Sequence, residues 1–444
     1  MKITLIYPNL GRHEDRGFRD RAAMEPLGLG VLAGLTPPDV EVVLHDDRVE
    51  DIPFDDPTDL VAITTQVFTA RRVYEICRAY RERGVRVILG GVHPTLLPEE
   101  AATHADSILV GDAEGAWPEV VQDLKAGKLK SRYHGSPGVA QAGGILPRWD
   151  LYRGKGYLPI NLIQYGRGCR FACDFCAVSA YFHRRHHYRP VAEVVAEVRS
   201  RKKRLFFFVD DNIVSDHRAA KDLFRALIPL KIRWVSQASL DMLEDPELME
   251  LMMESGCLGH VVGFESVDTG SLQGMGKYQN LRTGFGRYAQ AVDDLRACGL
   301  QTWAAFTLGH DHDTVDSLQE TLDFATKSRF AFAAFNILMP YPGTPLYRRL
   351  QSEDRLLFGG RWWRDPDYRF NHAAFRPANM TPDELTRIGL DSRKSFNSVG
   401  SILRRAADPK TNLKTLRKLL TFSMYGPLFR REALKKQDLK LGEH

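Results

Sequence analysis

Short β-branched segments alternate with amphipathic helical patterns in two blocks of this 444-residue chain, and this alternation restricts the fold more than any other feature of the sequence. Strands that alternate with helices are typical of βαβ units, which build parallel sheets with helices on their faces. Residues 136–158 are rich in Gly and Pro and predict a linker between the two blocks. We therefore expect an α/β protein with one parallel sheet in each block.

The first block, residues 1–135, predicts a Rossmann-like domain with a doubly wound parallel sheet. Its expected strands cover residues 3–7, 40–44, 60–65, 85–89 and 107–110. Sheets of this kind bind ligands beyond the carboxyl ends of their strands. Small and polar residues gather at those ends, which favours a ligand with phosphate or amide groups. These residues are Thr64, Thr65, Gln66, Gly90, Gly91, His93, Gly111 and Glu114.

Three glycines near the N-terminus, Gly28, Gly30 and Gly34, look like a dinucleotide-binding fingerprint. Their spacing is wrong for that motif, and they follow Pro26 rather than a strand, so the phosphate-binding turn is missing. We predict instead that they let a helix pack closely against its neighbours.

The second block, residues 159–380, predicts a partial (β/α)6 barrel. Its six expected strands cover residues 160–164, 205–209, 232–236, 260–264, 302–307 and 333–338, with helical patterns between them. In such barrels the chemistry takes place at the carboxyl ends of the strands. The remaining residues, 381–444, predict a small, basic helical domain.

Three cysteines, Cys169, Cys173 and Cys176, directly follow the first strand of the second block. Three thiolates on one loop are able to bind three irons of a 4Fe–4S cluster and leave the fourth iron open. The alternative is a zinc site with His183 or His186 as fourth ligand, although this histidine run is more typical of a solvated loop or a helix start. Cys257 and Cys298 lie on apolar patterns and predict buried thiols.

The Cys-x-x-x-Cys-x-x-Cys spacing, with the aromatic Phe175 before the last cysteine, resembles the signature of the radical S-adenosylmethionine superfamily. Polar motifs at the later strand ends extend this resemblance over the whole second block. The resemblance implies that S-adenosylmethionine chelates the open iron and is cleaved reductively to a 5′-deoxyadenosyl radical. By motif position, the implied contacts of S-adenosylmethionine are Phe175, Asp210, Asp211, Gln237, Glu265 and Ser266.

Asp210 and Asp211 have two further interpretations. Adjacent carboxylates sometimes form a general acid/base pair, but neighbours on a strand point to opposite faces. Asp211 and Asn212 are also typical residues at the N-cap of a helix.

The first block is similar to the cobalamin-binding domain of the class B radical methylases, through Gly90–His93 and Gly111–Glu114. This resemblance implies that the strand-end residues named above contact cobalamin. The chain lacks the Asp-x-His-x-x-Gly motif that supplies an axial histidine in methionine-synthase-type domains, since residues 45–48 do not match it. A domain that has lost cobalamin and acts as a scaffold is therefore an alternative.

Together the two resemblances imply a cobalamin-dependent radical methyltransferase that acts on an unactivated carbon or a phosphorus of a small-molecule, lipid or natural-product substrate. An oxidative cyclase or rearrangement enzyme of the same architecture, without methyl transfer, is the main alternative. A methylthiotransferase is disfavoured because the first block holds Cys77 as its one cysteine. A non-catalytic cobalamin-binding or membrane-surface protein is disfavoured because the cysteine triplet is intact.

The charge and the hydropathy of the chain limit where the protein is expected in the cell and which partners it is expected to bind. The chain shows no secretory signal and no apolar run of membrane-spanning length, so we expect a cytoplasmic protein. The radical chemistry implies a reductant such as flavodoxin or ferredoxin. A net charge of +5 gives no reason to expect nucleic acid.

The C-terminal segment 392–444 is the one strongly basic region, with 13 Lys and Arg against four Asp and Glu. Leucines and aromatic residues alternate with its cations. Such a segment either rests on an anionic membrane surface or caps the barrel with a solvated cationic face, and we favour the cap. Trp362 and Trp363 predict either the mouth of a substrate site or a packed domain junction.

Overall fold

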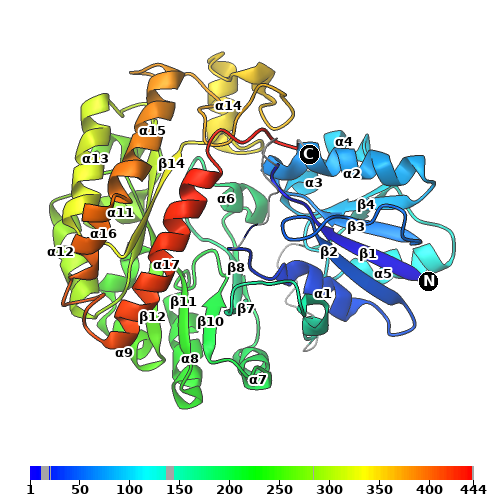
Figure 1. The fold of residues 1–444 in the computed structure, drawn as a ribbon, viewed down its shortest axis with the longest axis horizontal. Helices are drawn as coiled ribbons and strands as arrows, with labels where there is room; N and C mark the ends of the chain where they lie inside the picture. The colour runs from blue at the N-terminus through cyan, green and yellow to red at the C-terminus, as the bar shows by residue number, and fades with distance from the viewer. Residues whose placement is uncertain (12–19, 21, 137–144, 284, 443–444) are drawn as a thin grey trace.

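The computed structural model describes residues 1–11, 20, 22–136, 145–283 and 285–442. Two six-stranded sheets lie side by side, each with strands that are all parallel (Figure 1). The expected fold class is therefore confirmed. Among the described residues, no helix has both the length and the hydropathy that crossing a membrane requires.

The first sheet has the strand order β2-β1-β3-β4-β5-β6. All five expected strands are present, and a sixth was not expected because Arg132, Tyr133 and His134 carry no apolar run. The bounds are β1 (Lys2–Tyr7), β2 (Glu41–Asp46), β3 (Leu60–Thr64), β4 (Arg86–Gly90), β5 (Ser107–Val110) and β6 (Arg132–His134).

Helices cover both faces of this first sheet. Successive apolar side chains of its strands point to opposite faces, so both faces are apolar. Ile3 and Leu5 of β1 pack in the cluster that contains α1 (Leu27–Leu35) and α5 (Trp117–Lys125). Ile6 packs in a second cluster with α2 (Ala70–Glu82). The short helices α3 (Val92–Leu96) and α4 (Pro98–Ala102) follow β4.

Of the three glycines of α1, Gly30 and Gly34 pack closely as expected, whereas a Cβ at Gly28 would meet no atom within 4 Å. A Cβ at Gly30 would lie 2.0 Å from Tyr152 Oη, and one at Gly34 would lie 2.4 Å from the Leu146 carbonyl oxygen. Tyr152 belongs to the 3-10 helix Trp149–Tyr152, inside the predicted linker. The part of that linker from 137 to 144 lies outside the described residues.

The second sheet has the strand order β14-β13-β12-β11-β10-β7, so the strands follow one another in chain order and the sheet stays open between β7 and β14. Its bounds are β7 (Asn161–Ile163), β10 (Leu205–Phe208), β11 (Arg233–Ala238), β12 (Cys257–Glu265), β13 (Trp303–Leu308) and β14 (Phe332–Ile337).

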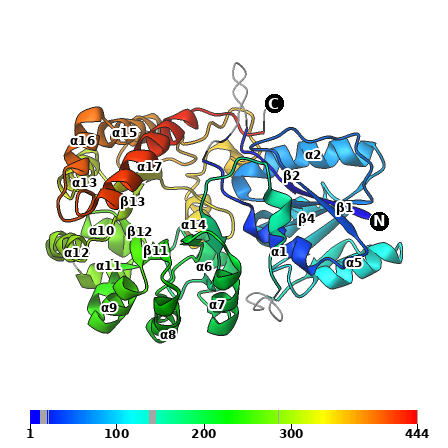
Figure 2. The same ribbon diagram turned by 60° about the horizontal axis from the view of Figure 1, so that its bottom comes forward.

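Helices form an arc around the outside of this sheet (Figure 2). They are α7 (Val191–Ser200), α8 (His217–Leu227), α9 (Pro246–Glu254), α12 (Phe285–Ala297) and α13 (Val315–Lys327). Three shorter helices, α10 (Thr269–Gly274), α11 (Tyr278–Thr283) and α14 (Pro345–Ser352), lie in the connections.

An antiparallel hairpin interrupts the barrel between its first two strands. It pairs β8 (Gly166–Gly168) with β9 (His186–Tyr188), and the cysteine loop and α6 (Ala177–Phe182) lie between the two strands. Neither strand was expected, because three residues such as Gly-Arg-Gly show no strand pattern.

The basic C-terminal segment packs on the barrel, as the cap interpretation predicts. It contains the end of α15 (Pro382–Phe396) and the whole of α16 (Val399–Ala406) and α17 (Leu416–Lys435). Phe429 of α17 lies 4.4 Å from Trp303 and 5.0 Å from Phe332 between ring centroids. Trp303 and Phe306 both belong to β13 and point to opposite faces of the sheet. Since Phe306 faces Phe324 of α13, α17 covers the other face.

The two adjacent tryptophans form a packed junction and not an open mouth. Trp362 and Trp363 are fully buried in a cluster that includes Val67 and Ala70 of the first block. Trp362 Nε1 donates to the Pro340 carbonyl at 3.0 Å, and Trp363 Nε1 donates to Glu100 Oε1 at 2.9 Å. The junction therefore joins the two sheets through both packing and hydrogen bonds.

Replacing Trp362 tests this junction. We expect Trp362→Ala to lower the free energy of unfolding by about 3–5 kcal/mol, because it leaves a large cavity between the sheets. The urea midpoint, followed by circular dichroism, measures the change. Tyr278→Ala is the control, since Tyr278 is 60% exposed and its loss should move the free energy by no more than about 0.5 kcal/mol. Equal midpoints for the two variants would contradict the junction.

Candidate active site

Two adjacent carboxylates at the end of β10 hold the backbone that leads into the cysteine loop. Asp210 Oδ2 accepts a hydrogen bond from the Tyr165 amide at 3.0 Å, and Asp210 Oδ1 accepts one from the Gly166 amide. Asp211 Oδ2 accepts from the Gly168 amide at 2.7 Å. Asp210 is fully buried, and this burial raises its pKa to about 7.

The helix-cap interpretation of Asp211 is wrong. The helix α8 begins at His217, and its N-cap is Asp216, whose side chain accepts from the Ala219 amide at 3.1 Å. The carboxylates of Asp210 and Asp211 accept hydrogen bonds from backbone amides of the loop instead. Their shared role in this structure is therefore to fix the path of the loop.

Of the three cysteine thiols, Cys173 is buried, and Cys169 and Cys176 are half-buried. Burial, with smaller contributions from Cys176, Glu265 and Cys169, raises the pKa of Cys173 to about 11 against the opposing charge of Lys277. Amide groups point at two of these sulfurs: Asn212 Nδ2 lies 3.7 Å from Cys169 Sγ, and Gln279 Nε2 lies 4.0 Å from Cys173 Sγ. Amide donors facing sulfur ligands are a feature of iron–sulfur sites.

This donor set fits a 4Fe–4S cluster with one open iron. Three thiols come from one short loop, and three is the number of cysteine ligands that such a cluster needs. His183 is exposed and ends α6 with a φ of 51°, whereas His186 lies in β9.

Glu265 is held in one orientation beside the cysteine loop. Its Oε1 pairs with Lys277 Nζ at 2.8 Å, and its Oε2 accepts from Thr307 Oγ1 at 2.7 Å. Burial by itself lowers the pKa of Lys277. The interactions with Glu265 and Cys173 raise this pKa by more than burial lowers it, so Lys277 stays cationic. A Cβ at Gly263 would lie 2.2 Å from Glu265 Oε1, so the glycine leaves room for this carboxylate.

The other predicted contacts of S-adenosylmethionine lie around the same loop. Gln237 Nε2 donates to the Asp210 carbonyl at 3.2 Å, and Ser266 Oγ accepts from the Asp268 amide at 3.1 Å. Phe175 packs against the core of the second sheet. Lys277, Gln279 and Thr307 were not predicted, because no motif marks them; Lys277 lies between α10 and α11, and Gln279 is the second residue of α11.

A cavity of about 540 Å³ lies between the two sheets and reaches from the first block to Arg167 and Ala177, the residues on either side of the cysteine loop. It is lined by Gln66 and Gly91 from the first block and by Asp211 and the helix α6 from the second. A smaller cavity of about 200 Å³ lies at the strand ends of the first sheet. Its lining includes Thr64, Gly90, Gly91, Gly111 and Glu114.

Six of the eight strand-end residues predicted for the first block thus line one or both cavities, and two do not. Thr65 is buried, and its amide donates to the Gly90 carbonyl at 2.7 Å. His93 is also buried, with its Nε2 2.7 Å from Tyr74 Oη, on the side of α2. Gly91 adopts a φ of 103°, which favours glycine at this close approach to Thr65.

Arg167 links the first block to the cysteine loop. Its guanidinium forms ion pairs with Glu114 and, at 3.3 Å, with Asp112. On the other side of the loop, Tyr181 Oη donates to Asp112 Oδ1 at 2.8 Å. Arg167 precedes the first cysteine and Tyr181 follows the last one, so both ends of the loop are bonded to the strand ends of the first sheet.

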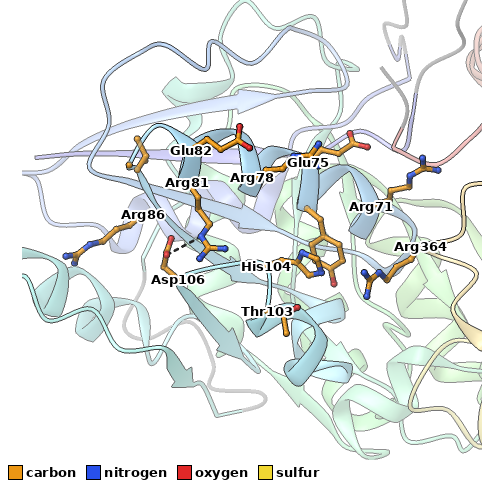
Figure 3. Close-up of a pocket in the computed structure, with 13 residues that line it drawn as sticks. Arg71, Glu75, Arg78, Arg81, Glu82, Arg86, Thr103, His104, Asp106 and Arg364 are labelled. Atoms are coloured by element: carbon orange, nitrogen blue, oxygen red, sulfur yellow. Dashed lines mark ion pairs between the residues drawn. The ribbon is translucent and has the colours of Figure 1, made fainter.

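A third cavity, of about 1020 Å³, lies on the outer face of α2, away from these residues (Figure 3). Five arginines line it, together with a stacked pair formed by Tyr74 and His104 whose ring centroids are 3.6 Å apart. None of the predicted cluster or S-adenosylmethionine residues lines this cavity. The arginines are Arg71, Arg78, Arg81, Arg86 and Arg364.

Replacing Asp210 tests its role in the loop. Asn has one oxygen acceptor for two backbone amides, so Asp210→Asn leaves a buried amide without its acceptor, which costs about 1–3 kcal/mol. We expect iron and sulfide bound after anaerobic reconstitution to fall to roughly half or less. Asp216→Asn is the control, because Asn caps a helix as well as Asp does. Wild-type iron content in Asp210→Asn would contradict this role.

Comparison with known proteins agrees with the geometry. The sequence model of the Radical SAM superfamily matches residues 163–325. Bacteriochlorophyllide d C-12(1)-methyltransferase of Chlorobaculum tepidum is 30% identical over 86% of this chain and 85% of its own length. Hopanoid C-2 methylase of Rhodopseudomonas palustris is 25% identical over 79% and 69%. The anaerobic magnesium-protoporphyrin IX monomethyl ester cyclase of Rubrivivax gelatinosus is 23% identical over 89% and 76%.

Two solved structures share the fold over almost the whole chain. OxsB, a cobalamin-dependent S-adenosylmethionine radical enzyme with aqua-cobalamin and S-adenosylmethionine bound, has a TM-score of 0.67 at 15% identity, covering 98% of this chain and 72% of OxsB. The methyltransferase TsrM from Kitasatospora setae, with tryptophan and a S-adenosylmethionine analogue bound, has a TM-score of 0.65 at 16% identity, covering 98% and 97%. With its cysteine triplet and its similarity to a methyltransferase over most of both sequences, the chain belongs to the radical SAM superfamily, in the group that includes these methyltransferases.

Proposed function

We propose that this protein is a cobalamin-dependent radical SAM methyltransferase that acts on an unactivated carbon, or on phosphorus, of a small-molecule, lipid or natural-product substrate. The observation that carries this proposal is the cavity between the sheets, which extends from the strand ends of the first block to the residues that flank the cysteine loop. Relatives that methylate bacteriochlorophyllide and a hopanoid, and the cobalamin bound in OxsB, support it.

The cofactors supply the organic chemistry: a 4Fe–4S cluster and S-adenosylmethionine give a 5′-deoxyadenosyl radical, and cobalamin carries the methyl group. The protein supplies the ligands and the environment. Cys169, Cys173 and Cys176 would hold three irons, and the amides of Asn212 and Gln279 would donate hydrogen bonds to sulfur, which favours the reduced, more negative cluster.

Glu265 is the best-positioned predicted contact of S-adenosylmethionine. Lys277 and Thr307 fix its carboxylate, so a polar group of the cofactor would meet an acceptor that needs no reorganisation. Direct contacts by Phe175, Gln237 and Ser266 stay predictions. For Asp210 and Asp211 we propose an indirect role as well, since their backbone bonds fix the loop on which the cofactor would sit.

The cobalamin site proposed for the first block follows the edge formed by its strand ends. Gly90, Gly91 and Gly111 have no side chains, so a large planar ligand is able to approach the backbone there. Thr64, Gln66 and Glu114 would offer polar groups at the same edge. His93 is turned toward Tyr74 and Glu100, which agrees with a site that uses no axial histidine of the Asp-x-His-x-x-Gly type.

Two partners complete the proposal. A one-electron reductant such as flavodoxin or ferredoxin would reduce the cluster. The basic segment 392–444, which packs on the barrel with one face, would contact a membrane surface with its exposed face. The domain boundaries 1–135, 159–380 and 381–444 stay predictions.

The ratio of the cofactor products tests methyl transfer. With a true substrate and cobalamin present, we expect equal amounts of S-adenosylhomocysteine and 5′-deoxyadenosine, because one S-adenosylmethionine supplies the methyl group and another the radical. Liquid chromatography with mass spectrometry measures both products. The Cys173→Ala control should make no 5′-deoxyadenosine. Turnover that yields 5′-deoxyadenosine without S-adenosylhomocysteine would contradict methyl transfer and favour the cyclase alternative that the Rubrivivax gelatinosus relative represents.

Replacing Glu265 tests its proposed contact with S-adenosylmethionine. Glu265→Gln removes the charge that pairs with Lys277, and we expect S-adenosylmethionine to bind roughly tenfold or more weakly, the size of a lost charged hydrogen bond. Iron content should stay at the wild-type value, which separates a binding effect from loss of the cluster. Glu244→Gln is the control, because Glu244 is exposed. Unchanged affinity in Glu265→Gln would show that this carboxylate does not hold the cofactor.

A further inference from the structure

The C-terminal helices expose an unusual number of large apolar side chains. Of the large hydrophobic residues that are exposed in the described part of the chain, six lie between residues 399 and 424, and Leu416 (73%) and Met424 (68%) are the most exposed of them. We call these six residues the apolar ridge. They are Val399, Leu403, Leu413, Leu416, Leu420 and Met424.

The ridge has members on both helices: Val399 and Leu403 are four residues apart on α16, and Leu413 lies between α16 and α17. Leu416, Leu420 and Met424 are four residues apart, so they form one stripe along α17. Phe422 and Phe429 lie on the opposite side and pack against Phe332 of the sheet. The helix therefore has two apolar faces, of which one stabilises the fold and the other meets solvent.

The exposed charges of the segment that carries the ridge are all positive, and the exposed acids beside it, Asp293 and Asp294, lie on α12. Between residues 399 and 430 the sequence contains one acidic residue, Asp408, which is fully buried and pairs with Arg296 at 2.8 Å. Two cations of this segment turn inward: Arg405 donates to the Ala331 carbonyl, and Lys418 to the Gly299 carbonyl. The remaining cations are exposed. They are Arg404, Lys410, Lys414, Arg417 and Arg430.

We propose that the apolar ridge and its cations dock this protein onto the surface of an anionic lipid bilayer. Apolar side chains on such a surface enter the boundary between headgroups and acyl chains, while Lys and Arg remain at the level of the anionic headgroups. A second copy of the chain fits this face less well, because it would bring the same unbalanced positive charge against the ridge. A bilayer with anionic headgroups complements both the apolar and the cationic parts.

The position of the ridge leaves the cysteine loop free. The α16–α17 connection is bonded to the amino ends of the barrel strands, where Gln301 Nε2, just before β13, donates to Asn412 Oδ1 at 2.9 Å. The cysteine loop lies at the carboxyl ends of the same strands, and α16 lies on the side far from the first sheet (Figure 1). A docked molecule would therefore keep its cluster accessible to a reductant. The docking proposal does not depend on which reaction the protein catalyses.

Vesicle flotation with the full, cluster-reconstituted chain tests this proposal. We expect binding to vesicles of phosphatidylcholine with phosphatidylglycerol and at least tenfold weaker binding to phosphatidylcholine alone. Replacing the stripe by Leu416→Ser, Leu420→Ser and Met424→Ser together should weaken binding at least tenfold, since burial of a single leucine is worth about that factor. Val315→Ser is the matched control, because Val315 is exposed on α13, outside the ridge.

A second pair of variants separates the charge of this face from the net charge of the protein. Lys414→Gln with Arg417→Gln should weaken binding to the anionic vesicles roughly tenfold or more, given about fivefold for each cation near the surface. Arg78→Gln with Arg86→Gln removes the same charge from the arginine-lined cavity on α2 and should leave binding unchanged (Figure 3). Cleavage of S-adenosylmethionine should stay at the wild-type rate in all of these variants.

Three results would overturn the proposal. The first is no binding of the wild-type chain to anionic vesicles, and the second is equal binding by the serine variant and the wild type. The third is a concentration-dependent dimer, seen by sedimentation, that the serine variant abolishes, because the ridge would then be an interface between two copies. None of these results bears on methyl transfer, which the cofactor products report separately.

Discussion

The candidate active site depends on the hydrogen bonds that two adjacent carboxylates, the buried Asp210 and the half-buried Asp211, accept from the backbone before the first cysteine. Asp210 and Asp211 together accept from the amides of Tyr165, Gly166 and Gly168. Since burying a carboxylate without such donors is costly, the strand end and the loop determine each other's position. The loop that carries the three cysteines thus begins from a backbone whose position is fixed.

The same loop carries the contact between the two sheets. Arg167 pairs with Asp112 and Glu114 on one side, and Tyr181 bonds to Asp112 on the other. The cavity between the sheets thus has walls whose relative position is fixed by buried charge pairs. A cofactor in the first block and one on the cysteine loop would meet in that space, which is the geometric requirement for passing a methyl group between them.

Sequence reasoning identified the elements that carry a long periodic pattern and missed those that depend on tertiary contacts. The strands around Leu60 and Ala304 were identified from their apolar runs, and the cysteine triplet from its spacing. The strand at Arg132 and the hairpin at Gly166 exist because a neighbouring strand pairs with them, which no local pattern reports. Lys277 reaches Glu265 through the fold of the α10–α11 turn, so only the structure places it at the site.

The most direct test of this account is the cofactor content of the wild-type chain, purified without oxygen and with cobalamin supplied. Absorbance and mass spectrometry of the bound material would give both stoichiometries in one sample. The account predicts about one cobalamin beside about one 4Fe–4S cluster per chain. A full cluster without bound cobalamin would contradict it, because the first sheet would then be a scaffold and the space between the sheets would serve another reaction.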